Sequence, residues 1–177
     1  FREGHLLSDT GVQDYSGNEK RGTRIEFVPD NSKGLFENYH FRDDFIETMM
    51  RNYAYLNTGL TLVYNGKKYS SKNGLYDLLT DNMTVEPLYP IIHLQGEDIE
   101  IALTHTNQSG EEYHSFVNGQ HTVQGGTHQV AYREAIARTI KEFFNKNQEY
   151  SDIRNGVVGA IAINVSEPVF ESQTKVK

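Results

Sequence analysis

The residues best suited to chemistry stand near the end of the chain, in the triplet Gln173-Thr174-Lys175. On an extended segment, side chains two positions apart point the same way, so Gln173 and Lys175 would face one target. An amide and an ammonium group together offer a neutral donor and a positive charge, which suits a single anionic group. The alternative interpretation is a frayed polar tail that follows a strand and Pro168 and has no function.

A second candidate is Gly125-Gly126-Thr127-His128, which precedes a long segment with helical periodicity. One interpretation is a turn from strand to helix with Thr127 as the N-terminal cap. The other is an anion site at the helix N-terminus, where backbone N–H groups lack partners within the helix. A lone Gly-Gly pair supports that site weakly, because no lysine follows it as in a phosphate-binding P-loop.

Other chemistries have less support in the sequence. Four of the seven histidines, at positions 105, 114, 121 and 128, are spread over strands and turns without the spacing of metal ligands, so we predict solvated histidines on strand faces. Glu97, Asp98 and Glu100 cluster between two predicted strands and indicate a solvated hairpin end. The chain has no Gly-x-Ser-x-Gly nucleophile motif, and without cysteine it has neither a disulfide nor a thiolate metal site.

The elements that must position these residues alternate irregularly, which indicates an α+β fold and not a doubly wound nucleotide-binding sheet. Asn65-Gly66 between two strand-like runs is a strong hairpin signal, and Gly59 stands where a left-handed helix cap is expected. The run at 158–165 is almost continuously apolar, as in a central strand. We predict strands at 1–7, 23–28, 61–64, 67–70, 91–95, 99–106, 113–117 and 158–165, helices at 41–57 and 127–145, a short helix from about residue 73, a linker at 80–89 and a helical turn at 151–157.

The composition limits the possible partners. The 177 residues carry 17 Lys and Arg against 24 Asp and Glu, a net charge of −7, with 37% hydrophobic residues, as in an ordinary soluble globular protein. An acidic chain is not a general nucleic-acid coat, so any DNA contact would be local, for example at Lys67-Lys68 or at 141–146. No run approaches 18 apolar residues, which excludes a membrane span. A start at Phe1 and an abrupt end at Lys177 favour a piece of a longer protein.

Five motifs occur in order along the chain and together resemble one family. They are Gly22-Thr23-x-Ile25-x-Phe27-x-Pro29-Asp30, Arg51-x-x-Ala54-Tyr55-Leu56-Asn57-x-Gly59, Ser115-Phe116-Val117-Asn118, Thr122-x-x-Gly125-Gly126-Thr127-His128 and Pro168-x-Phe170-x-x-Gln173-Thr174-Lys175. Over nearly the whole chain this series resembles the ATPase (B) subunit of bacterial type IIA DNA topoisomerases, which are DNA gyrase and topoisomerase IV. Gln-Thr-Lys is a signature of that family. Ala131-Tyr132 and Asn155 depart from its usual residues and leave the choice between gyrase and topoisomerase IV open.

The resemblance implies a domain organisation and three site residues. Residues 1–72 would be the C-terminal part of a GHKL ATP-binding domain, and residues 73–177 a transducer domain. The transducer would share the fold of a ribosomal-protein domain and of GHMP kinases, with a left-handed βαβ crossover that breaks the usual rule of handedness. Thr23 matches the threonine that lines the family's adenine pocket. Gln173 and Lys175 match the residues that reach from the transducer to the γ-phosphate of ATP.

The resemblance also implies a function for the whole subunit. It would be part of a cytoplasmic, chromosome-associated bacterial topoisomerase that uses ATP and Mg²⁺, acts on duplex DNA, dimerises through its ATPase region and works with the DNA-cleaving A subunit. The family's general base and Mg²⁺ ligand would lie upstream of Phe1, so we expect the fragment alone to be inactive, with no catalytic residue, metal or cofactor of its own. Two alternatives remain: a non-catalytic α+β binding module with an unrelated tail, and a GHMP-type kinase, for which Gly125-Gly126 is too short a phosphate loop.

Overall fold

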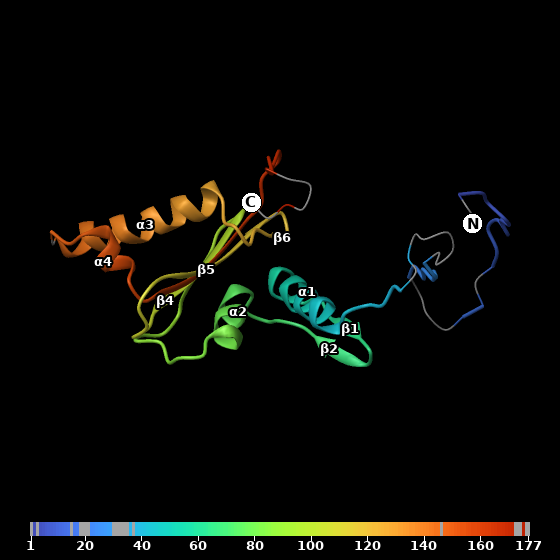
Figure 1. The fold of residues 1–177 in the computed structure, drawn as a ribbon, viewed down its shortest axis with the longest axis horizontal. Helices are drawn as coiled ribbons and strands as arrows, with labels where there is room; N and C mark the ends of the chain where they lie inside the picture. The colour runs from blue at the N-terminus through green and yellow to red at the C-terminus, as the bar shows by residue number, and fades with distance from the viewer. Residues whose placement is uncertain are drawn as a thin grey trace. The chain divides into compact units, whose positions relative to one another are not determined.

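The fold is described from a computed structural model, drawn as a ribbon in Figure 1. The chain forms two compact units, residues 1–40 and 41–177. In the first unit Arg2 and His5 pair through two backbone hydrogen bonds of 2.9 Å across Gly4, so a turn replaces the predicted strand at 1–7. The structure describes residues 2, 4–14, 16–17, 22–29, 36, 38–145, 147–171 and 175.

The strand predicted at 23–28 is also wrong. Residues 22–29 are extended but belong to no sheet, and Ile25 and Phe27 are 81% and 70% exposed. A strand requires a neighbour that takes its backbone hydrogen bonds, and the described part of this unit supplies none. The alternation itself is kept, because Arg24 and Glu26 lie on one side of the chain and form an ion pair of 3.1 Å.

All the helices and strands predicted beyond residue 41 are present in the second unit, with bounds shifted by a few residues, and the α+β class is confirmed. No helix among the described residues is long and apolar enough to cross a membrane. In chain order the elements are α1 (Asp43–Leu56), β1 (Leu62–Tyr64), β2 (Lys67–Tyr69), α2 (Leu75–Asn82), β3 (Ile92–Gln95), β4 (Ile99–His105), β5 (Glu112–Val117), β6 (Gln120–His121), α3 (Thr127–Phe144), α4 (Tyr150–Arg154) and β7 (Val157–Ile163).

Two Asn-Gly turns connect neighbouring antiparallel strands. In the β1–β2 hairpin, Asn65 and Gly66 have φ angles of 48° and 79°, as the sequence predicts. Asn118 and Gly119, with φ angles of 49° and 77°, form a second turn of this kind between β5 and β6. Strand β6 was not predicted, because it has only two residues, too few for an alternating pattern.

The end of α1 differs from expectation. Gly59 has a left-handed φ of 87°, but it lies beyond the cap residue Asn57, whose φ is −134°. Asn57 instead folds back, and its Nδ2 donates to the carbonyl oxygen of Tyr53 at 2.9 Å. Gly59 therefore serves the turn toward β1 and does not cap the helix.

The main sheet has five strands in the order β3-β4-β7-β5-β6, with the apolar strand β7 at its centre. Strand β7 runs antiparallel to β4 and parallel to β5, so the chain crosses over from β5 to β7 through β6, α3 and α4. The sequence prediction of a buried central strand is confirmed, since residues 157–161 are all buried. The handedness of this crossover stays a prediction.

Helices pack on both faces of this sheet, with α2 on one face and α3 on the other (Figure 1). Alternate residues of β7 serve the two faces: Val158 and Ala160 contact the α2 side, and Val157 and Ile161 contact the α3 side. Because side chains alternate along a strand, one apolar run supplies both cores. The central strand is thus packed on both faces and bonded along both edges.

The predicted domain boundary between residues 72 and 73 falls just before α2, within the second compact unit. Hydrogen bonds cross this point. The Tyr55 hydroxyl of α1 donates to Asp81 at 2.7 Å, and the Ser71 hydroxyl donates to Asp77 at 2.7 Å. The boundary stays a prediction about the family's domains, and α1 packs as part of the unit that contains the sheet.

Candidate functional site

The candidate site is the segment that follows β7 and leads to Lys175. Lys175 is half-buried and has a left-handed φ of 54°, which is uncommon for a residue with a side chain. Such conformations are found preferentially at functional sites. Because of this φ angle, the prediction that Lys175 lies on an extended backbone is wrong. Gln173 and Thr174 lie outside the described residues, and their roles stay predictions.

The side chain of Asn118 holds the start of this segment. Its Nδ2 donates to the carbonyl oxygen of Val165 at 2.8 Å, and the backbone N–H of Val165 donates to its Oδ1 at 2.8 Å. The backbone N–H of Asn118 donates to the carbonyl oxygen of Ile163 at 2.9 Å. On the other side, the N–H of Asn164 donates to the carbonyl oxygen of Asp98 at 2.9 Å. The chain therefore leaves the sheet with its backbone bonded on both sides.

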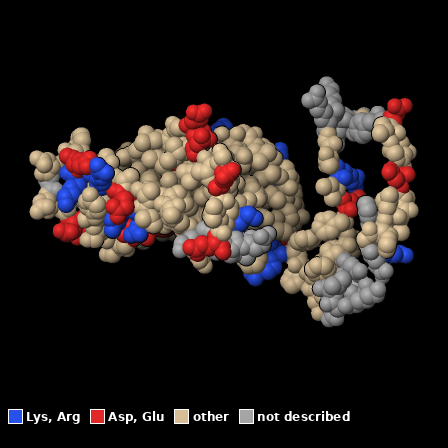
Figure 2. All heavy atoms as spheres, turned by 90° about the horizontal axis from the view of Figure 1, so that it is seen from above, with Lys and Arg blue, Asp and Glu red and all other residues tan. Residues whose placement is uncertain are grey.

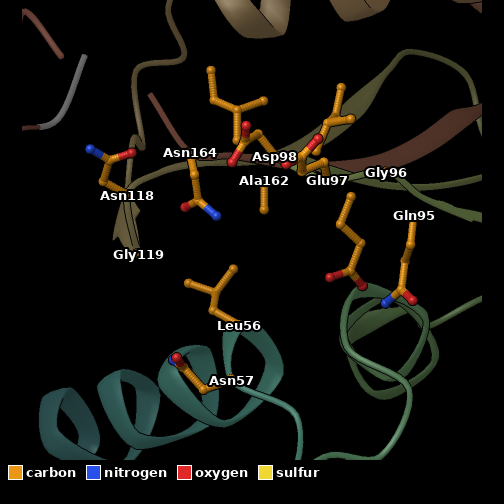
Figure 3. Close-up of a pocket in the computed structure, with 13 residues that line it drawn as sticks. Leu56, Asn57, Gln95, Gly96, Glu97, Asp98, Asn118, Gly119, Ala162 and Asn164 are labelled. Carbon is orange, nitrogen blue, oxygen red and sulfur yellow. The ribbon is translucent and has the colours of Figure 1, made fainter. Parts of the chain in front are cut away.

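A polar pocket of about 510 Å³ adjoins this exit (Figure 3). Glu97 and Asp98 line it from the β3–β4 turn, and Asn118 lines it from the β5–β6 turn. Its carboxylates make it a poor site for a phosphate, because like charges repel at short range. The remaining lining comes from the end of α1, from both turns and their strands and from the end of β7: Leu56, Asn57, Gln95, Gly96, Ile99, Glu100, Gly119, Ala162, Ile163 and Asn164.

The acidic cluster beside the pocket is a hairpin end, as predicted, but it is solvated only at Glu97 and Asp98 and not at Glu100. The N–H of Gly96 donates to the carbonyl oxygen of Ile99 at 2.7 Å and closes the β3–β4 turn. Glu100 has partners of its own: its Oε1 accepts from the N–H of Leu75 at 2.7 Å and lies 2.8 Å from Nε2 of His93. Glu100 thus holds the start of α2, because a carboxylate at a helix N-terminus accepts from its unpaired N–H groups.

The Gly125-Gly126-Thr127-His128 motif lies beside the terminal segment, residues 164–171, and we call residues 126–128 the seat of that segment. Residues 167–171 line one pocket of about 450 Å³ together with Thr122 and residues 126–128. Gly125 and Gly126 have φ angles of 77° and 152°, which favour glycine, and Gly126 is the N-terminal cap of α3. The prediction of Thr127 as the cap is wrong, because Thr127 is the first residue inside the helix and no side chain caps it.

A buried polar network fixes the motif to the sheet. The hydroxyl groups of Ser115 and Thr122, which are 1% and 2% exposed, lie 2.7 Å apart. The Thr122 hydroxyl also lies 3.2 Å from Nε2 of His128, and the Ser115 hydroxyl donates to Oε1 of Gln129 at 3.0 Å. Because such groups are costly to bury unpaired, the network specifies how β5, the turn and α3 meet.

Several histidines are structural and not solvated. Burial lowers the pKa of His128 and of His121, so both are neutral near pH 7. His105 lies between the Tyr89 hydroxyl, 2.6 Å from its Nδ1, and the carbonyl oxygen of Ile153, 2.7 Å from its Nε2. The expectation of solvated strand-face histidines is wrong for these residues. Within the described ranges no group of three or more His, Asp or Glu could hold a metal ion.

Thr23, the third predicted site residue, belongs to the first unit and is exposed. Lys175 belongs to the second unit. The sequence predicts no role for Asn118, which belongs to the Ser115-Phe116-Val117-Asn118 motif, and the available signal is Asn-Gly after a strand, which predicts a turn with a polar side chain at its tip. Its partner Val165 is 47 positions away, and no local pattern indicates it.

The sequence model of the DNA gyrase B family matches residues 44–177, which includes the sheet, α3 and the terminal segment. The chain belongs to the DNA gyrase B family. It is 40% identical over its whole length to the B subunit of DNA topoisomerase 4 from Borreliella burgdorferi and covers 29% of that protein. It is 30% identical to the B subunit of DNA gyrase from Helicobacter pylori, again over the whole chain, and covers 25% of that protein. The chain thus spans less than a third of these relatives.

The fold is shared with solved ATPase structures. The chain resembles the 43K ATPase domain of Thermus thermophilus gyrase B with a TM-score of 0.63 and 26% identity, over 81% of this chain and 44% of that one. The ATPase region of Saccharomyces cerevisiae topoisomerase II gives a TM-score of 0.65 at 22% identity, over 80% and 37%, which shows the fold alone.

Proposed function

We propose that this chain is part of the ATP-hydrolysing subunit of a type IIA DNA topoisomerase and links the state of the nucleotide to movement of the sheet. Family membership supports this, since relatives are B subunits of gyrase and topoisomerase IV. The observation that carries the proposal is that Lys175 follows the central strand β7 on a segment whose start Asn118 bonds to the β5–β6 turn.

The proposed chemistry is electrostatic. The Lys175 ammonium neutralises charge on the γ-phosphate, and the Gln173 amide donates to one of its oxygens, as placed donors do in phosphoryl transfer. Thr23 lines the adenine site. When the γ-phosphate is lost, the segment is released, which is a switch between order and disorder. Because β7 is bonded to both β4 and β5, a change at its end reaches the whole sheet.

ATP would be the substrate of the whole subunit, with Mg²⁺ bound to its phosphates. The donor set at Lys175 fits an anionic phosphate, because ammonium and amide groups are donors. Among the residues that the structure describes, no group of three or more His, Asp or Glu could hold a metal ion. The acidic pocket of Figure 3 is not the phosphate site, for the electrostatic reason given above. The chain thus contributes the sensor, and we expect no hydrolysis from it alone.

Duplex DNA, a homodimeric ATPase region and the DNA-cleaving A subunit are the proposed partners, in the bacterial cytoplasm. Direct contact of this chain with DNA would be weak and salt-sensitive. Figure 2 shows acidic and basic side chains interspersed, most densely over α4 and the C-terminal end of α3. Lys67 is already paired with Glu47 at 2.9 Å. Few phosphate contacts give little counterion release and hence little affinity.

Turnover of ATP by the intact subunit tests the proposal. Lys175→Ala removes a charge-assisted contact worth roughly 1.5–3 kcal/mol in ordinary binding and more in a closed site. We expect turnover to fall by about 10²-fold or more, since each 1.36 kcal/mol is about tenfold. Gln173→Ala should be milder, because a neutral donor is weaker.

Lys72→Ala is the matched control, because the Lys72 side chain is exposed and only the backbone N–H of this residue, which the substitution keeps, donates to Asp77. Its turnover should equal that of the wild type. If Lys175→Ala stayed within about twofold of the wild type, the triplet would be a polar tail and the binding-module alternative would be favoured.

A further inference from the structure

We infer that Asn118 is the positioning residue that sets where the segment carrying Lys175 leaves the sheet. The inference rests on the proposed function, because it assigns Asn118 a role in γ-phosphate sensing through Lys175. Asn118 itself would touch no nucleotide. It acts by holding the backbone of Val165, and the two residues are 47 positions apart.

The contact between Asn118 and Val165 resembles the hydrogen bonding between two strands, but a side-chain amide replaces one of the two backbones. The Asn118 amide both donates to and accepts from the backbone of Val165, at 2.8 Å in each direction. Backbone pairing alone ends at the bond from the N–H of Asn118 to the carbonyl oxygen of Ile163. The side chain therefore extends the ladder between β5 and β7 by two residues, and a side-chain amide can make both bonds because it carries a donor and an acceptor.

The turn that carries Asn118 is tied to buried residues of the sheet. Asn118 occupies a left-handed position, φ 49°, in the turn between β5 and β6, where asparagine is favoured. The strand before the turn contains Ser115 and Phe116, which are both 1% exposed. The hydroxyl of Ser115 is bonded to that of Thr122 beyond β6. The amide thus projects from a turn that is bonded to the sheet, and Figure 3 shows it at the rim of the pocket, beside Gly119.

Lys175 lies ten residues after Val165 in the sequence. Residues 167–171 of this stretch lie beside the seat at 126–128. Without the Asn118 bonds, Val165 and Ser166 gain conformational freedom that binding of the γ-phosphate must then remove, and ordering each residue is costly. The consequence is a nucleotide-dependent effect: ligands that engage Lys175 should bind more weakly, and ligands that do not should be unaffected.

Asn118→Gly is the informative variant. Glycine adopts the left-handed φ without strain, so the turn is kept while both bonds to Val165 are lost. Asn118→Asp keeps the acceptor for the N–H of Val165 but cannot donate to its carbonyl oxygen, so it should lie between Gly and wild type. Gln120→Ala is the matched control, because this side-chain amide is exposed on the same hairpin and forms no hydrogen bond with any described residue.

The experiment is a double-mutant cycle in the intact subunit, with affinities for ADP and for a non-hydrolysable ATP analogue. We expect Asn118→Gly to weaken analogue binding by about tenfold, the scale of one or two net hydrogen bonds. ADP affinity and the melting temperature should barely change, and Gln120→Ala should match wild type. In the Lys175→Ala background, Asn118→Gly should add less than about twofold, because coupled residues are not additive.

The outcomes separate this inference from the proposed function. If Lys175→Ala weakens analogue binding but Asn118→Gly has no effect, or adds its full effect to Lys175→Ala, the inference is overturned and γ-phosphate sensing stands. Equal losses of ADP and analogue affinity in Asn118→Gly would make its role merely structural and also overturn it. If Lys175→Ala leaves analogue affinity unchanged, the proposed function fails, and the role given to Asn118 fails with it.

Discussion

Two segments are associated with predicted nucleotide contacts: residues 22–29 contain Thr23, and residues 163–171 precede Gln173 and Lys175. The two segments differ in the hydrogen bonds that their backbones form. Around Thr23 the chain is extended, exposed and outside any sheet. After β7 the chain continues for two residues bonded to the turns on either side, at Asn118 and at Asp98. Polar and apolar residues alternate at 24–27 and again at 163–166, so the difference comes from the hydrogen-bond partners that the backbone of each segment finds. Alternating polar and apolar side chains are compatible with a strand, but the segment becomes a strand only when a neighbouring strand takes its backbone hydrogen bonds.

The largest expected difference concerns two phenylalanines. Phe116 lies in the paired strand β5 and is 1% exposed, whereas Phe27 lies in the unpaired segment and is 70% exposed. Phe116→Ala should lower the free energy of unfolding by about 3–5 kcal/mol, through lost burial and a cavity. Phe27→Ala should change it by no more than about 0.5 kcal/mol. Denaturant unfolding of the two variants checks this, and similar losses would show that 22–29 is packed after all.

Two ion pairs extend the comparison to electrostatics. Arg133 binds Glu111 through two bonds of 2.9 and 2.7 Å, and this is the main cause that lowers the pKa of Glu111 to about 2 from an ordinary 4.5. Glu26 and Arg24 form one exposed bond of 3.1 Å. Glu111→Gln should cost about 1 kcal/mol at pH 7, discounted for partial exposure, and Glu26→Gln nothing measurable.

The pH dependence of this effect has a definite sign. The folded-state pKa of Glu111 lies below its unfolded value, so the stabilisation is complete above about pH 4.5 and is lost as pH falls toward about 2. Unfolding curves of wild type and Glu111→Gln should therefore converge over that range. A difference that persisted below pH 2 would mean that packing, and not charge, is responsible.

The smallest effect is expected at the seat of the terminal segment. Thr127→Ala should change stability by no more than about 0.5 kcal/mol, because Gly126 and not Thr127 is the cap of α3. A threonine cap would cost about 0.5–2 kcal/mol when removed. Thermal unfolding distinguishes the two, and a loss near the top of that range would restore Thr127 as a cap.

Prediction from sequence succeeded where the determining contacts are local. The periodicity of α1 and α3, the Asn65-Gly66 turn and the apolar run of β7 each contain their own signal. It failed at 23–28, because whether a strand forms depends on a distant partner and the described part of the first unit supplies none, and at Thr127, because the cap of α3 is the preceding residue, Gly126. The bond between Asn118 and Val165 joins positions 47 apart, and only the order of strands in the sheet brings them together.

The central claim is that the segment after β7 responds to the γ-phosphate through Lys175. Amide hydrogen exchange of the intact subunit, followed in a peptide that covers residues 164–175, tests it most directly. We predict slower exchange with a non-hydrolysable ATP analogue than with ADP, and loss of that difference in Lys175→Ala but not in Lys72→Ala. Equal exchange of this peptide with the analogue and with ADP in the wild type would contradict the claim.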